Sequence, residues 1–105
     1  MAQVLAIVAD LMLGSKVEAM LASAGHEVEW VHSVPASTEA DVIVADLHAV
    51  DAAAVIALGV PALGFYAHTD VEVKRQAEKG GFAVVVPRSR MARELPELVA
   101  KLLGE

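Results

Sequence analysis

The sequence predicts an α/β domain in which helices cover both faces of a parallel sheet. The 105-residue chain contains four unbroken apolar runs, and runs without polar alternation are typical of strands buried on both faces. Segments with helical spacing of apolar residues lie between most of these runs. Strands that alternate with helices through right-handed crossovers give a parallel sheet. We therefore expect a single doubly wound domain over residues 1–105.

Five segments are predicted to be strands, and one of them differs from the others in its pattern of apolar residues. The four apolar runs are residues 4–9, 41–46, 61–66 and 82–86. Residues 27–31 partly alternate between charged and apolar side chains, which is typical of an edge strand. Doubly wound sheets of five strands commonly have the order 2-1-3-4-5, so we expect that order here.

The connection between the second and third strands is predicted to lack a helix. The first crossover carries a capping box, Ser15 to Glu18, which predicts a helix that begins there and ends at Gly25. By contrast, only residues 32–40 join the second strand to the third. A parallel crossover usually takes a dozen or more residues. We therefore expect four helices, with the second helix of the regular alternation missing.

Three further helices are predicted after the third strand. Asp51 can cap a short Ala-rich helix that ends at Gly59. A second capping box, residues 69–72, predicts a helix that Gly80 and Gly81 stop. The last helix has one apolar face, and we expect Pro96 in or near its first turn.

Composition narrows the classes of function. The formal net charge is −6, and the longest run of basic residues is the pair Lys74-Arg75, so a nucleic-acid partner is not expected. The chain has no cysteine, which removes disulfides and thiol chemistry. No apolar run reaches the ~20 residues that a bilayer requires, and the first residues do not resemble a signal peptide. We expect a cytoplasmic protein without membrane contact.

Two aspartates follow neighbouring strands of the predicted sheet. Asp10 ends the first apolar run and Asp46 ends the third, and ligands of such sheets bind outside these carboxyl ends. Two carboxylates that meet there can hold Mg²⁺, and Arg88 is the basic residue placed to reach them. The alternative is structural, because an Asp after a strand is often a helix N-cap or an Asx-turn residue.

Four segments carry a resemblance to a known family. They are Val8-Ala9-Asp10, the third strand from Asp41 to Leu47, the fourth from Pro61 to Ala67, and Val84-Val85-Val86-Pro87-Arg88. Along nearly its whole length the chain resembles the receiver domain of bacterial response regulators, which has the flavodoxin-like fold. The resemblance implies that Asp46 is the phosphoacceptor. It also implies that Asp10, Asp46 and the backbone carbonyl of His48 are the ligands of Mg²⁺.

The chain departs from the receiver pattern at five positions, one of which is Ser89, where receivers carry a Pro. Ala9 replaces the first acid of the acidic pair, and Tyr66 stands where receivers carry a small Thr or Ser. Val85 occupies the position of the aromatic switch residue, and Arg88 replaces a Lys. The Arg side chain ends in a planar guanidinium group and the Lys side chain in a compact ammonium group, so this exchange is not conservative. We therefore expect a degenerate receiver in which phosphorylation of Asp46 is weak or absent.

The function expected from this resemblance is regulatory and not enzymatic. A stand-alone receiver-like module would act by binding a protein partner or a histidine kinase, through a surface that spans roughly residues 71–103. The alternative is a small metal-dependent phosphotransfer or hydrolytic enzyme that uses Asp10, Asp46 and His48. A purely structural module is the third hypothesis.

His48 also fits part of the cobalamin-binding signature Asp-x-His-x-x-Gly, but Asp51 replaces the Gly, so we interpret this match as coincidence. The remaining histidines, His26, His32 and His68, show no metal-ligand spacing.

The missing helix predicts a gap beside the edge strand. Val28 and Trp30 lie on that strand, and burying a large apolar side chain stabilises a protein by about 2–3 kcal/mol. We expect the loop to cover the gap through Val34 and Pro35. The alternative is a homodimer in which a second copy of the chain docks there.

Overall fold

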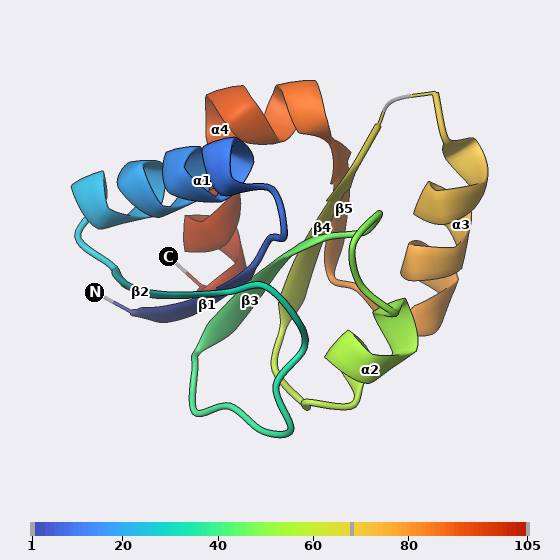
Figure 1. The fold of residues 1–105 in the computed structure, drawn as a ribbon, viewed down its shortest axis with the longest axis horizontal. Helices are drawn as coiled ribbons and strands as arrows, with labels where there is room; N and C mark the ends of the chain where they lie inside the picture. The colour runs from blue at the N-terminus through green and yellow to red at the C-terminus, as the bar shows by residue number, and fades with distance from the viewer. Residues whose placement is uncertain (1, 68, 105) are drawn as a thin grey trace.

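Five parallel strands form one sheet with the order β2-β1-β3-β4-β5, which confirms the predicted topology (Figure 1). The computed structural model describes residues 2–67 and 69–104, so His68 lies outside the described residues. The strands are β1 (Gln3–Ile7), β2 (Glu27–Val31), β3 (Val42–Asp46), β4 (Ala62–Tyr66) and β5 (Val84–Pro87). The helices are α1 (Leu11–Ser23), α2 (Ala52–Ile56), α3 (Val71–Gly80) and α4 (Arg88–Leu102). As predicted, residues 32–41 contain no helix.

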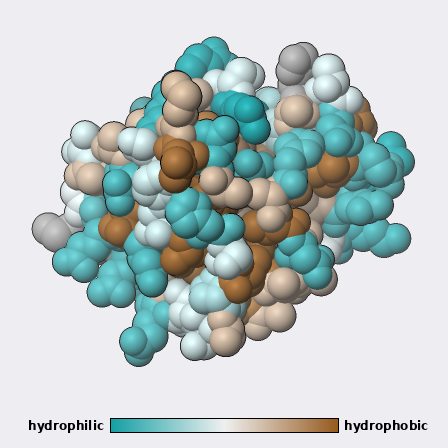
Figure 2. All heavy atoms as spheres, in the orientation of Figure 1, coloured by the Kyte–Doolittle hydropathy of each residue, from teal (hydrophilic) through white to brown (hydrophobic). Residues whose placement is uncertain are grey.

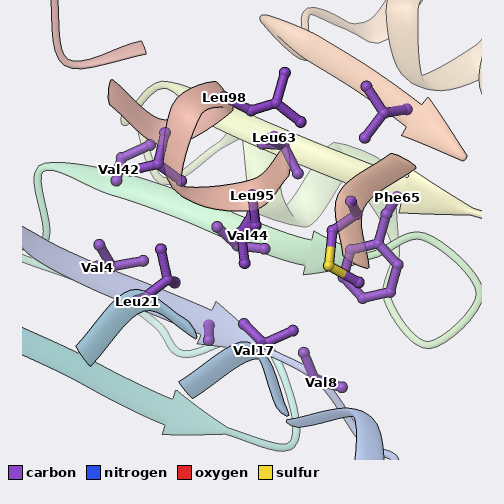
Figure 3. Packing of buried hydrophobic residues seen from close by; sticks show 14 residues of the cluster. Val4, Val8, Val17, Leu21, Val42, Val44, Leu63, Phe65, Leu95 and Leu98 are labelled. Carbon is purple, nitrogen blue, oxygen red and sulfur yellow. The ribbon is translucent and has the colours of Figure 1, made fainter. Parts of the chain in front are cut away.

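The sheet separates two apolar clusters because successive side chains of a strand point to opposite faces. On one face, α1 and α4 pack against alternate residues of β1, β3 and β4, among them Val44 and Phe65 (Figure 3). On the other face, Leu5, Ile43 and their neighbours pack under α2 and α3. Every residue of β3 and β4 is buried, which explains their unbroken apolar sequences. None of the helices in the described residues is long and apolar enough to span a membrane.

The helix boundaries correct three predictions, one of which is the capping box of residues 69–72, because the N-cap of α3 is Asp70 and not Thr69. Helix α1 begins at Leu11 and not at Ser15, because Asp10 is its N-cap and accepts a hydrogen bond from the backbone N–H of Leu13. Helix α4 begins at Arg88, directly after β5, with no intervening loop. Pro96 therefore lies well inside α4 and not in its first turn. The predicted N-cap Asp51 is confirmed for α2, and the predicted stop at Gly80-Gly81 is confirmed for α3.

The prediction for Trp30 was wrong about which face of the sheet it occupies. Trp30 and Val28 pack on the α1 and α4 side, so neither the loop nor a second chain is needed to cover them. The indole lies against the buried Gly14 of α1, and its Nε1–H donates to the backbone oxygen of Val8 over 2.9 Å. The homodimer stays a prediction, but the uncovered Trp30 that motivated it is not found.

The face of β2 that lacks a helix carries a different set of side chains. Glu27, Glu29 and Val31 alternate with Val28 and Trp30, so they point away from α1. Val34 packs with Val31 against the cluster under α2 and α3, which confirms the loop contact expected of Val34. The loop therefore covers the apolar end of β2 and leaves the glutamates exposed. On the face shown in Figure 2, hydrophobic atoms gather in a central area, and hydrophilic atoms dominate the periphery.

Candidate functional site

Asp46 lies at the carboxyl end of β3, the position that the sequence analysis assigned to it. It is 5% exposed, and no other residue with a polar or charged side chain is buried to this degree in the described part of the chain. Its Oδ1 accepts a hydrogen bond from the backbone N–H of His48 over 3.0 Å, which closes an Asx turn. The carboxylate thus has a structural role, and this was one of the two alternatives for it.

The turn after Asp46 is held on the sheet by a close side-chain contact. The side chain of Leu47 lies on Gly64 of β4, where a Cβ atom would approach three Leu47 side-chain carbons to 2.8 Å. The backbone N–H of Leu47 also donates to the oxygen of Phe65 over 3.0 Å. Because Gly64 has no side chain, Leu47 can lie flat on β4. This contact fixes the direction in which Asp46 and His48 leave the strand.

The imidazole of His48 connects the ends of two strands with the start of α3. Its Nε2 accepts a hydrogen bond from the backbone N–H of Ala67 over 2.8 Å, directly after β4. Its Nδ1 lies 3.9 Å from Oδ2 of Asp70, and Oδ1 of Asp70 caps α3 by accepting from the N–H of Val73. Because Nε2 accepts, the neutral ring carries its proton on Nδ1, facing Asp70. The side chain is 32% exposed, so this histidine is partly enclosed and not free in a loop.

Asp10 lies at the same edge of the sheet, because it follows β1, which pairs with β3 in parallel. It is exposed, and Oδ1 is used to cap α1. Within the described residues, hydrogen bonds to Asp10 and Asp46 involve Oδ1 only, so Oδ2 of each carboxylate is available to another partner.

The three expected switch positions have separate surroundings. Tyr66 ends β4 and is 6% exposed, as part of the apolar cluster under α2 and α3. Val85 lies on the edge strand β5 and is half-buried against the same cluster. Arg88 is the first residue of α4, is exposed, and lines a pocket with Lys16 of α1. In the described part of the chain, Arg88 forms no ion pair with Asp10 or Asp46.

The donor atoms at this edge of the sheet suit a hard cation in kind but are few in number. Magnesium prefers carboxylate and carbonyl oxygens, which Asp10, Asp46 and the His48 carbonyl would supply. Among residues 2–67 and 69–104, no three His, Cys, Asp or Glu side chains are grouped so that they could hold a metal ion. The role of Asp10 and Asp46 as ligands of a cation stays a prediction.

Sequence reasoning missed the role of the His48 ring. It named the residue for its backbone carbonyl, for a partial motif and as part of the alternative enzyme site, whereas the ring binds the Ala67 amide. Every residue except proline can donate a backbone N–H, so no pattern of residue types could reveal this bond. Sequence reasoning also did not predict the pocket that Lys16 of α1 shares with Arg88 and Ser89 of α4.

Solved structures show which known fold the chain shares, whereas no protein-family model and no curated protein matches it. The chain is similar to a response regulator receiver domain protein from Clostridium thermocellum, at 15% identity and a TM-score of 0.85, with 99% of this chain and 95% of that one covered. It is also similar to the non-phosphorylated HemR receiver domain from Leptospira biflexa, at 18% identity and a TM-score of 0.80, with 100% and 96% covered. The receiver domain of Francisella response regulator 1452 matches at 17% identity and a TM-score of 0.83, with 99% and 98% covered.

One similar structure is a much longer protein. NtrX from Brucella abortus, in complex with ADP, matches at 14% identity and a TM-score of 0.83 over 98% of this chain. The chain spans 27% of the length of NtrX. Together with the observed topology, these likenesses show that the chain has the flavodoxin-like fold of receiver domains.

Proposed function

We propose that the chain is a response-regulator-like signalling module that acts by binding a protein partner, with little or no phosphorylation of Asp46. The main support is the combination of a receiver fold along the whole chain with an Asp46 site in which Oδ1 of Asp46 and the Ala67 amide already form internal hydrogen bonds. A protein with this fold that has lost efficient phosphorylation retains its surfaces, and those surfaces would carry the function.

Four features at the carboxyl edge argue against efficient phosphorylation. Ala9 supplies no carboxylate for a cation, and the buried Tyr66 replaces a small hydroxyl. The Arg88 side chain lines a pocket beside α1, while the Ala67 amide already donates to the His48 ring. A phosphoryl group on Asp46 would need donors and cations to balance its charge. Forming such contacts would require Arg88 and His48 to rearrange.

Magnesium, if bound, would be held by Asp10, Asp46 and the His48 carbonyl. It would supply positive charge that offsets the negative charge of an incoming phosphoryl group. With two side-chain ligands, we expect binding of this cation to be weak.

The partner surface that we propose comprises α3, β5 and α4. Val71 at the start of α3 is 58% exposed, and β5 is an edge strand whose Val84 and Val85 are half-buried. Exposed apolar side chains beside an edge strand are typical of protein-binding surfaces. A histidine kinase is one candidate partner of this module.

The test is NMR spectroscopy of the ¹⁵N-labelled protein with Mg²⁺ and beryllofluoride, followed by labelling with acetyl phosphate. We expect small shifts near Asp46 and slow labelling of the wild type. The double variant Tyr66→Thr/Arg88→Lys should label faster, and His48→Ala should add to this by freeing the Ala67 amide. Labelling of the wild type at the rate of an ordinary receiver domain would contradict the proposal. Catalytic turnover of acetyl phosphate would favour the metal-dependent enzyme instead.

A further inference from the structure

A pocket between α1 and α4 adjoins the Asp46 turn, because Ala67, whose amide binds the His48 ring, lies in its wall. It has a volume of about 410 Å³, which is within the range of small-molecule sites. It is lined by Leu13, Lys16, Ala67, Arg88, Ser89 and Ala92. Neither Asp10 nor Asp46 lines it, although the backbone N–H of Leu13 in its wall donates to Asp10.

The charged residues that line the pocket are opposite in sign to the net charge of the protein. The protein carries a formal net charge of −6, but the two charged residues that line this pocket are Lys16 and Arg88. They come from different helices, and within the described part of the chain neither is paired with a carboxylate. Two cations that share a pocket without an internal counterion attract an anion from solution.

Further donors at the pocket suit an oxyanion. The Arg88 guanidinium is a planar fork that can bind a carboxylate or a phosphate through two parallel hydrogen bonds. Ser89 adds a hydroxyl group from the first turn of α4. No side chain caps this helix, whose N-cap is Pro87, so its first amides are not bound by a capping side chain.

The remaining wall of the pocket is apolar. Leu13, Ala67 and Ala92 line it, and they offer a small surface to the body of a ligand. We propose that this pocket binds a small organic oxyanion, a phosphate monoester or a carboxylate on a compact apolar body. Lys16 and Arg88 would bind the charged group from opposite helices, and the apolar wall would receive the body.

NMR titration of the ¹⁵N-labelled protein with phenyl phosphate, benzoate, inorganic phosphate and benzyl alcohol tests this proposal. We expect saturable shifts at the amides of Lys16, Ser89 and Ala92 with phenyl phosphate or benzoate. The stronger of these two ligands identifies the preferred oxyanion. Inorganic phosphate should bind more weakly, because it lacks the apolar body, and neutral benzyl alcohol should bind weakest of all.

Matched variants separate this pocket from general charge effects. The double variant Lys16→Ala/Arg88→Ala should weaken binding at least about fivefold, because each exposed ion pair contributes a modest part of the affinity. The control Lys79→Ala/Lys101→Ala removes the same charge from α3 and α4 outside the pocket, and should change binding less than about twofold. Equal weakening in both variants would overturn the proposal, as would the absence of saturation. Shifts confined to Asp46 and His48 would place the anion at the other site and also overturn it.

Discussion

The two faces of the edge strand β2 differ in what covers them. On one face, α1 covers Trp30, and the indole lies on Gly14 and donates to the oxygen of Val8. On the other face no helix is present, and β2 presents Glu27 and Glu29 to solvent. A helix is needed where a strand presents large apolar side chains, because leaving them in water is costly. Where the strand presents carboxylates, a loop is sufficient.

The largest expected difference between the faces is in stability. Trp30→Ala should lower the free energy of unfolding by about 2–3 kcal/mol, because it removes a half-buried aromatic ring and its hydrogen bond. Glu29→Ala, one residue away on the opposite face, should change it by less than about 0.5 kcal/mol. Urea denaturation followed by circular dichroism measures both. Comparable losses in the two variants would show that the face without a helix contributes to stability as much as the covered one.

The contact between α1 and Trp30 gives the second prediction. A Cβ atom on Gly14 would lie 2.2 Å from two ring carbons of Trp30, so the indole or the helix would have to move. Gly14→Ala should therefore destabilise the protein by about 1–2 kcal/mol, although Ala is the better helix former. Gly80→Ala is the matched control, because open space surrounds its Cβ position, and it should stabilise by about 0.5 kcal/mol.

A double-mutant cycle shows whether the Gly14 effect acts through the indole. In a Trp30→Leu background, the smaller side chain leaves room for a methyl group at position 14. Gly14→Ala should then be nearly neutral or stabilising. If the loss in this background equals the loss in the wild type, the indole is not the obstacle.

The sequence predicted the edge strand but placed its side chains on the wrong face. The alternation over residues 27–31 shows that Val28 and Trp30 share one face and Glu27 and Glu29 the other. It does not show which of these two sets of side chains faces α1, because the alternation is the same whichever face of the sheet the helix covers. Gly14 was the missed signal. A glycine inside a helix costs about 1 kcal/mol relative to alanine, and here it provides the space that Trp30 occupies.

The candidate site could be predicted in position, whereas the hydrogen bonds of its two aspartates could be predicted only as one of two alternatives. The apolar strands placed Asp10 and Asp46 at the same edge of the sheet, and the order of β1 and β3 agrees with this. The caps and turns that these carboxylates form depend on backbone amides, whose direction the residue types do not encode. For the same reason, the bond between His48 and Ala67 could only be found in the structure. The role of Asp10 and Asp46 as metal ligands stays a prediction.

The smallest expected effect concerns the charged face of β2. Glu27, Glu29 and Glu39 line one groove of about 410 Å³ beside the loop, and none of them forms an ion pair in the described part of the chain. Like charges in one groove repel each other, although solvent and salt weaken the repulsion. Glu27→Gln/Glu29→Gln should therefore raise Tm by about 1–2 °C at low ionic strength, and the gain should vanish near 0.5 M NaCl.

The control for this prediction changes the net charge equally at other places. Glu78→Gln/Glu97→Gln also brings the formal net charge from −6 to −4, but on α3 and α4. Lys74 and Lys101 lie four residues from these glutamates, a spacing at which opposite charges on a helix attract weakly, so the control variant should not gain stability. An equal rise of Tm in both variants would mean that overall charge, and not the groove, sets the effect. A rise confined to Glu27→Gln/Glu29→Gln would show that the carboxylates on the face without a helix reduce stability.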